Sequence, residues 1–215
     1  MTILMFEATD ARVSSRDNTS QHVKGARLMD AISVLTDDHH KARGLFTAFR
    51  AASEADDAEQ MGSVAEKIFE ELDTHTAIEE RVFYPALKEA GGSDLEELTD
   101  ESNEEHHVVD VLMKELKEIS PSDPAYPAKM TVLMENVEHH AGEEEKEMFP
   151  KVRNIFSETQ LKELGLALHR EKHVYRLENK SVDELHKEAA ELEIAGRSEL
   201  DREGLVSAIL SEYDV

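Results

Sequence analysis

Two copies of one short motif place a histidine and a glutamate one helical turn apart. The first copy reads HTAIEERVFYP and starts at His75; the second reads HAGEEEKEMFP and starts 65 residues later, at His140. With about 3.6 residues per turn, His75 lies next to Glu79 on a helix, and His140 lies next to Glu144. Each copy therefore offers one imidazole and one carboxylate from a single helix face, and both groups are ligands for first-row transition metals.

Both pairs lie on apolar helix faces. In the first copy, Ile68 and Leu72 continue the stripe that contains His75 and Glu79, and the second copy repeats this pattern. A single histidine on such a face is usually a hydrogen-bonded core residue. A carboxylate in the core, however, needs a cation. Two copies of the pair therefore favour a buried metal site.

A second repeat supplies two more histidines. The segment TDDHHKARGLF recurs 67 residues later as NEEHHVVDVLM, so the chain contains an internal duplication. Apolar residues at heptad spacing place His39 on the core face of its helix and His40 on the flank. In the second copy His106 shares the apolar stripe, whereas His107 has charged helical neighbours and points toward water. Glu105 lies beside this stripe and is a candidate for an additional carboxylate ligand.

These motifs lie on four segments with helical periodicity, two in each half of the duplication. Gly91 and Gly92 end the second segment, and three prolines between residues 121 and 127 mark the loop before the fourth. Pro85 and Pro150 each come late in a segment, where they predict a kink or a break in the last turn. The sequence therefore predicts an all-α, antiparallel four-helix bundle around one metal centre. The expected helices span residues 28–55, 58–90, 94–119 and 127–154, and a fifth spans residues 158–177.

The motifs DDHH, HTAIEE with FYP, EEHH and HHAGEEE with FP, in this order, resemble the hemerythrin-like, HHE cation-binding family. The resemblance covers roughly residues 30–156 and implies a four-helix bundle that holds a di-iron centre. Ser102 stands where oxygen-carrying hemerythrins have a further histidine, and the second His-carboxylate pair has three intervening residues instead of four. Both departures disfavour reversible oxygen carriage. The resemblance implies imidazole ligands at His39, His75, His106 and His140, and bridging carboxylates at Glu79 and Glu144.

The residue types narrow the choice of metal. The chain has no cysteine, so thiolate sites are excluded, and imidazole and carboxylate ligands suit iron or manganese and also admit zinc. Six ligands are too many for one tetrahedral ion. Two ions that share both carboxylates keep open positions for water, oxide, peroxide or a diatomic gas. With the di-iron centre that the resemblance implies, we expect two iron ions with an oxo or hydroxo bridge, and consider manganese or zinc less suited.

Several neighbouring side chains could support such a centre. Tyr84 and Phe149 occupy matched positions in the repeat and could shield the pocket. Four acids are candidates to accept the remaining N–H of the ligand imidazoles: Asp38, Glu80, Glu105 and Glu145.

Two further histidines lie outside these motifs. His169 and His173 have the spacing of a two-histidine metal face but lack a matching carboxylate, which favours a surface or interface role.

The composition limits the partners. The formal net charge of −24 over 215 residues disfavours nucleic acid and anionic membranes. No segment approaches the roughly 18 apolar residues of a membrane span, and the sequence MTILMFEATD lacks the features of a secretory signal. Together with the absence of cysteine, these observations predict a cytoplasmic protein without a membrane partner.

The C-terminal sequence differs from the bundle. Residues 181–215 resemble the short N-terminal helical motif of Rho transcription termination factor and its SAP-like relatives, with two helices, an extended joint at Gly196 and a helix cap at Asp201. Ten acidic residues against three basic ones predict a protein partner or a dimer contact instead of nucleic acid. The expected domains are a flexible arm (residues 1–28), the metal-binding bundle (29–156), a connecting helix (157–180) and this motif (181–215).

The resemblance implies binding or turnover of a small oxygen or nitrogen species, namely O2, H2O2 or NO, in oxidative or nitrosative stress. Catalase-like peroxide disproportionation is the enzymatic form of this hypothesis. The alternatives are a non-catalytic iron-binding or sensing module that acts through a protein partner, and a structural zinc bundle. No residue is singled out by its spacing as a proton-transfer group.

Overall fold

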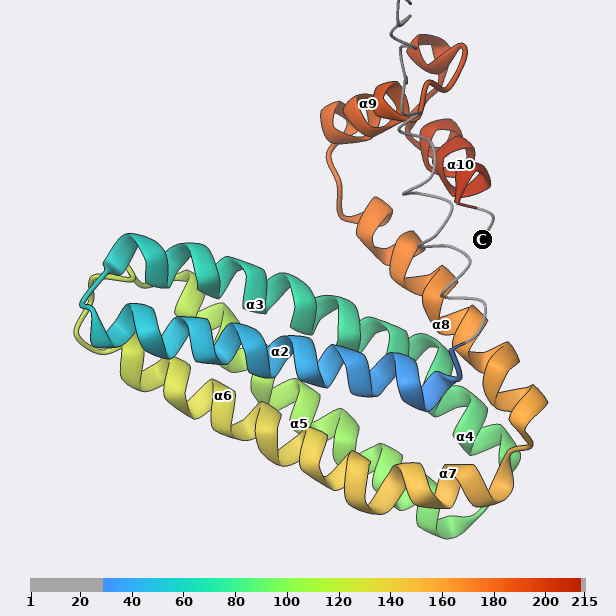
Figure 1. The fold of residues 1–215 in the computed structure, drawn as a ribbon, viewed down its shortest axis with the longest axis horizontal. Coiled ribbons are helices and arrows are strands. Elements are labelled where there is room, and N and C mark those ends of the chain that lie inside the picture. The colour runs from blue at the N-terminus through green and yellow to red at the C-terminus, as the bar shows by residue number, and fades with distance from the viewer. Residues whose placement is uncertain (1–28, 214–215) are drawn as a thin grey trace, which may run out of the picture.

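The computed structural model describes residues 29–213 of the chain. Within this range all regular structure is helical, and four antiparallel helical stretches form the bundle (Figure 1). The predicted all-α bundle is confirmed. The first and third stretches are single helices, and the second and fourth each contain a π-helical segment: α2 (Ala31–Glu54), α3 (Ala58–Ile78) with η1 (Glu79–Phe83) and α4 (Tyr84–Ala90), α5 (Ser93–Lys117), and α6 (Tyr126–Glu143) with η2 (Glu144–Met148) and α7 (Phe149–Ile155).

Local sequence explains where these helices begin and end. The Asp30 carboxylate accepts a hydrogen bond from the Ser33 N–H at 2.8 Å and thereby caps α2. Asp57 caps α3 in the same way. The second stretch ends at Gly91, whose φ of 82° belongs to the left-handed region that glycine tolerates. The second helical stretch therefore occupies residues 58–90, as the sequence predicted.

The π-helical segments lie directly before the two late prolines. The N–H of Tyr84 donates to the carbonyl of Glu79, and the N–H of Phe149 donates to the carbonyl of Glu144, so each bond spans five residues. A proline in an α-helix crowds the carbonyl four residues earlier and offers no N–H. The wider π turn accommodates it. The sequence predicted a kink or a break in the last turn; the break does not occur, because both helices continue beyond their prolines to Ala90 and Ile155.

Two apolar clusters fill the bundle, one toward each end. One includes Phe46, Phe49 and Met130, and the other includes Leu35 and Phe83. The residues with metal-ligand chemistry lie between them along the helices. Apolar packing on both sides therefore separates this polar layer from water at the bundle ends.

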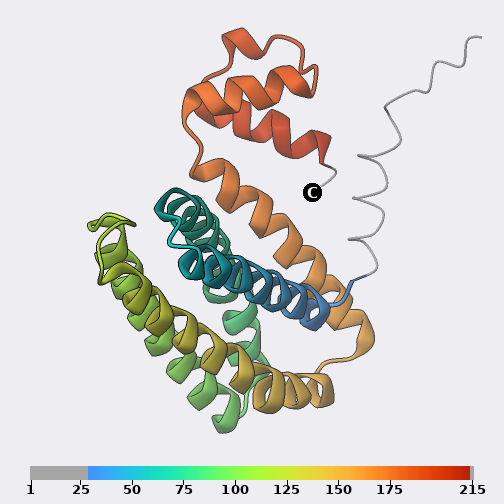
Figure 2. The same ribbon diagram turned by 60° about the vertical axis from the view of Figure 1, so that its left-hand side comes forward.

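A fifth helix, α8 (Glu158–Glu178), packs against α2 and α3 (Figure 2). Ser157 and Gln160 form a capping box at its start. Gly165 allows the close crossing, because a Cβ atom at this position would lie 2.5 Å from the Met29 carbonyl oxygen. The first half of the duplication is thus covered by a helix that follows the bundle in sequence.

The C-terminal residues form a small unit on the end of α8. It contains α9 (Val182–Glu191), the short 3-10 helix η3 (Arg197–Glu199) and α10 (Arg202–Glu212). Gly196 has a φ of 71° and Asp201 caps α10, as expected, but residues 197–199 form a helical turn where an extended joint was predicted. Arg202 donates to the carbonyl oxygen of Lys180 at 2.7 Å and so satisfies a group at the end of α8. The core of this unit comprises Leu177, Leu185, Ala189, Leu205 and Ile209.

The predicted flexible arm, residues 1–28, lies outside the described residues. Between residues 29 and 213, no helix has the combination of length and apolar composition that a membrane span requires.

Candidate metal centre

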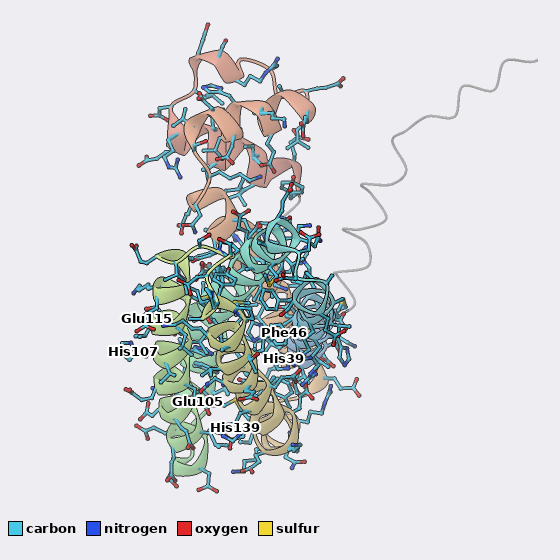
Figure 3. All side chains as sticks on the ribbon, turned by 90° about the vertical axis from the view of Figure 1, so that its left-hand side faces the viewer. His39, Phe46, Glu105, His107, Glu115 and His139 are labelled. Carbon is cyan, nitrogen blue, oxygen red and sulfur yellow. The ribbon has the colours of Figure 1, made fainter. Side chains whose placement is uncertain are left out.

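Six side chains from all four helical stretches meet in the middle of the bundle. The four histidines come from α2, α3, α5 and α6, and each glutamate is the first residue of a π-helical segment. Figure 3 shows the contrast between His39, inside the bundle, and His107, on the outer surface of α5. The six side chains that meet here are all buried, and they are the six that the sequence predicted as ligands: His39, His75, Glu79, His106, His140 and Glu144.

The histidines form two pairs whose Nε2 atoms face each other. The Nε2 atoms of His39 and His75 are 3.2 Å apart, and those of His106 and His140 are 3.1 Å apart. Each pair therefore joins one histidine of an HH doublet to one histidine of an HxxxE motif. The two halves of the duplication each supply one complete pair.

The two glutamates connect the pairs. Oε2 of Glu79 lies 3.3 Å from the Nε2 atoms of both His75 and His106. Oε2 of Glu144 lies 3.3 Å from Nε2 of His39 and 3.7 Å from Nε2 of His140. Each carboxylate thus reaches both histidine pairs, which is the arrangement that a shared, bridging ligand requires.

Two buried oxygen atoms indicate that these residues fit a cation. Oε1 of Glu79 and Oε2 of Glu144 are inaccessible to water and have no hydrogen-bond partner. A buried carboxylate oxygen without a partner is costly, and metal coordination would satisfy it. In one group of facing donor atoms, Glu79 and Glu144 lie with His39 and His75. In a second group, Glu79 lies with His106 and His140. The donor set of imidazole and carboxylate suits iron, manganese or zinc.

Protonation balances the charge of this layer where no metal is bound. Burial alone would raise the pKa of Glu79, but His75, His106 and His140 hold that pKa well below its usual range. Burial alone would lower the pKa of His140, but Glu144, Glu105 and Glu79 raise it well above its usual value. The buried carboxylates thus favour protons on imidazoles such as that of His140. Metal binding must release them, because a ligand nitrogen has to be deprotonated.

Each of the four imidazoles also touches an outer carboxylate through Nδ1. This contact fixes the ring so that Nε2 points into the centre. The duplication relates the contacts in pairs, since Asp38 and Glu105 correspond, as do Glu80 and Glu145. The four acids are those singled out from the sequence: Glu145 with His39 at 2.9 Å, Asp38 with His75 at 3.4 Å, Glu80 with His106 at 3.1 Å, and Glu105 with His140 at 2.8 Å.

Glu105 was also a candidate for a direct ligand. Its Oε2 atom contacts Nδ1 of His140, on the side of the ring that faces away from the centre. Its Oε1 atom lies 3.8 Å from His139, whose side chain is 66% exposed. The structure therefore places Glu105 outside the six-residue cluster, as a support for His140.

Tyr84 adds a hydrogen-bond donor that the sequence did not reveal. Its hydroxyl donates to Glu144 at 3.0 Å and to Glu79 at 3.3 Å. Burial and the two carboxylates raise the pKa of Tyr84 well above its usual value, so the hydroxyl keeps its proton. The repeat has Phe149 at the matched position. Its ring stacks on His39 with centroids 5.9 Å apart, as Tyr84 stacks on His106 at 5.7 Å.

A small cavity lies beside the four imidazoles. Its volume is about 30 Å³, and apolar side chains including Leu72, Val109 and Val137 complete its wall. A cavity needs roughly 10–15 Å³ to hold one water molecule. The space is therefore large enough for a ligand of two or three atoms next to the centre.

The remaining histidines of the motifs lie elsewhere. His40 and His107 are exposed, as predicted for the outer members of their doublets. Among residues 29–213, His169 and His173 form no metal-ligand cluster with a carboxylate. Their rings are 4.8 Å apart, and His173 stacks on Tyr213 of the C-terminal unit. These two residues thus belong to an internal interface.

A four-helix bundle with two imidazole pairs and two shared carboxylates in its core defines a metal-binding bundle protein. Comparison with known proteins places this chain more narrowly. The family model of the hemerythrin HHE cation binding domain matches residues 30–152. The chain belongs to this family, as its motifs indicated.

Two relatives and one solved structure are similar to this chain. An uncharacterized protein of Mycobacterium tuberculosis is 32% identical over 139 residues, which are 64% of this chain and 81% of the relative. A protein of a Nostoc species named DNA nickase is 31% identical over 133 residues, but the match spans 61% of this chain and only 36% of that protein. The crystal structure of a hemerythrin HHE cation binding domain-containing protein from Mycobacterium kansasii has a TM-score of 0.58, 27% identity, and coverage of 84% of this chain and 99% of its own.

Proposed function

We propose that the protein holds two iron ions between its histidine pairs and there binds or turns over O2, H2O2 or NO. His39 and His75 would hold one ion, His106 and His140 the other, and Glu79 and Glu144 would bridge them. When bound, the ions supply open coordination positions for a small ligand. Oxidative or nitrosative stress is the setting we propose, with the cytoplasm as the location.

The observation that carries this proposal is the position of the small cavity. It borders all four imidazoles and has a volume of about 30 Å³. The volume of this space suits a diatomic gas or peroxide better than an organic substrate. A structural zinc site needs no cavity, because its coordination is closed by protein ligands.

The chain itself supplies the control of protons around this space. The Tyr84 hydroxyl points at both shared carboxylates and, with its raised pKa, acts there as a fixed hydrogen-bond donor. The outer carboxylates keep each imidazole in one orientation. The apolar wall excludes bulk water, which limits proton exchange to these groups.

Metal analysis and an ultraviolet-visible spectrum of protein purified with its native metal test the proposal. We expect two irons per chain and oxo-to-iron charge-transfer bands. One zinc per chain, or no metal, would contradict it. Hydrogen peroxide should then perturb the bands.

The alternative is a non-catalytic module that binds or senses iron or a small ligand. Contact between His173 and Tyr213 favours this alternative, because it links α8, which packs on the bundle, to the acidic C-terminal unit. That unit would carry the signal to a protein partner or a second copy. Oxygen evolution after addition of peroxide distinguishes the two functions, since a sensor should not sustain turnover.

A further inference from the structure

The two halves of the centre differ in the charge behind their imidazoles. Behind His75, Asp38 forms an ion pair with Lys172 of α8. Behind His39, Glu145 forms an ion pair with Arg43 at 2.8 Å. A fixed cation therefore pairs with each outer carboxylate of the first pair, and Arg43 is shared with Glu138 at 3.0 Å.

The second pair has no such cations in the described part of the chain. Glu80, behind His106, contacts no lysine or arginine between residues 29 and 213. Glu105, behind His140, has only histidine partners in the same range. The outer carboxylates of this pair keep their full negative charge.

The difference arises from one helix and one substitution within the repeat. α8 packs on α2 and α3, and this placement brings Lys172 to Asp38 although 134 residues separate them. The residue that corresponds to Arg43 in the second half is Asp110, which pairs with Lys114 at the surface. The duplication made the ligands alike, but their electrostatic surroundings are different.

We propose that the two metal positions are unequal, and that the position of His106 and His140 binds a divalent cation more tightly than that of His39 and His75. This inference rests on the proposed dinuclear centre. An unneutralised carboxylate that accepts the Nδ1 proton makes the imidazole a stronger donor and attracts the ion directly. Lys172 and Arg43 weaken both effects at the first position.

An opposing effect has to be weighed. Lys172 and Arg43 also anchor their carboxylates and so hold His75 and His39 in place, which favours metal binding at the first position. The anchoring acts on orientation alone, whereas Lys172 and Arg43 add positive charge close to a doubly charged ion. We expect the effect of charge to be larger than the effect of anchoring. Removal of the Lys172 charge should then tighten metal binding at the first position, whereas loss of anchoring would weaken it.

Cobalt(II) titration of the metal-free full-length chain tests the inference, with the visible cobalt bands and a competing chelator as readouts. Wild type should bind two cobalt ions; binding of one or none would count against the proposed function, not against the inequality. His75→Ala leaves the second position intact, and His140→Ala leaves the first. We expect His75→Ala to bind its remaining cobalt ion about tenfold more tightly than His140→Ala does. This factor is the lower end of the effects that outer carboxylates have on metal affinity.

Lys172→Met then identifies the cause. Methionine keeps most of the packing of the lysine stem but removes the charge. Added to His140→Ala, it should tighten cobalt binding by about tenfold; added to His75→Ala, it should change little. Lys129→Met is the matched control, because Lys129 pairs with Glu115 about three helical turns from His140. Equal affinities of the two single variants, or weaker binding after Lys172→Met, would overturn the inference, provided that circular dichroism shows unchanged helicity.

Discussion

The two histidine pairs come from copies of one sequence motif, yet their surroundings differ. The first pair, His39 and His75, lies under α8 and is backed by two ion pairs. The second pair, His106 and His140, is backed by carboxylates that face the surface of α5 and α6. Duplication can thus supply two equivalent histidine pairs, while a helix outside the duplicated segment makes their surroundings different.

The largest expected effect concerns a residue that both positions share. Glu144→Ala removes a carboxylate that reaches both histidine pairs, so we expect the metal content to fall from two ions to less than one per chain. Glu145→Ala removes only the outer support of His39 and should lower affinity about 10–100-fold at one position. His107→Ala, at the surface, is the control. Stoichiometric metal in Glu144→Ala, measured by elemental analysis, would contradict the shared role.

The next effect concerns the helix that distinguishes the halves. In Gly165→Ala the new Cβ would lie 2.5 Å from the Met29 carbonyl oxygen, so α8 has to move away from the start of α2. We expect the free energy of unfolding to fall by about 3 kcal/mol, the upper range for overpacking. Gly44→Ala is the matched control: its Cβ meets nothing within 4 Å, and alanine should stabilise that helix by about 0.5–1 kcal/mol. Chemical denaturation measures both; a neutral Gly165→Ala would show that α8 is not fixed by this crossing.

A smaller effect tests the aromatic residues at matched positions. Tyr84→Phe makes the first copy of the motif resemble the second, which has Phe149. It removes a donor to Glu79 and Glu144, and we expect metal-free protein to lose about 1–2 kcal/mol of stability, since hydrogen bonds to charged groups are stronger than neutral ones. Tyr126→Phe is the control, because Tyr126 packs against Phe49 in the apolar cluster. Equal stability of both variants would remove the assigned role of the Tyr84 hydroxyl.

The smallest effect is a pH dependence of the contact between α8 and the C-terminal unit. Burial, followed by the charges of His169 and Arg176, lowers the pKa of His173 to about 4, while Glu188 opposes the shift and Lys172 adds to it. A histidine with a pKa below that of the unfolded chain binds fewer protons when folded, so its contribution is lost as pH falls from about 6.5 through 4. His173 is half-exposed, and solvent screening keeps the effect small.

Hydrogen exchange of residues 182–213 checks this dependence. After correction for the intrinsic exchange rate, protection of residues 182–213 should decrease as the pH falls from about 6.5 to 4. Protection of the bundle should decrease less. His173→Phe keeps an aromatic ring against Tyr213 and should abolish the decrease. A decrease that persists in this variant would assign the effect to other groups, among which His169 and Glu188 are the nearest titratable neighbours.

The sequence predicted which six residues meet in the bundle core, because the information is local and occurs twice. The apolar stripe around His39 separates it from His40, and the repeat alignment with Glu79 separates Glu144 from the adjacent glutamates. The four outer acids also follow from their positions beside the motifs. For these residues, helical periodicity and duplication were sufficient.

Other features depend on contacts between distant segments and could not be predicted. The ion pair of Lys172 with Asp38 requires the docking of α8, which the pattern of that helix does not specify. The π-helical segments arise from Pro85 and Pro150, but the sequence does not distinguish a widened turn from a break. Tyr84 differs from its counterpart by one hydroxyl, and only the structure shows that this group reaches both carboxylates.

Anomalous diffraction at the iron edge, from crystals of protein purified with its native metal, tests the central claim most directly. We predict two peaks in the bundle core, one beside the Nε2 atoms of His39 and His75 and one beside those of His106 and His140. The carboxylates of Glu79 and Glu144 should reach both peaks. A single peak, no peak, or metal held by other side chains would contradict a centre assembled from both halves of the duplication.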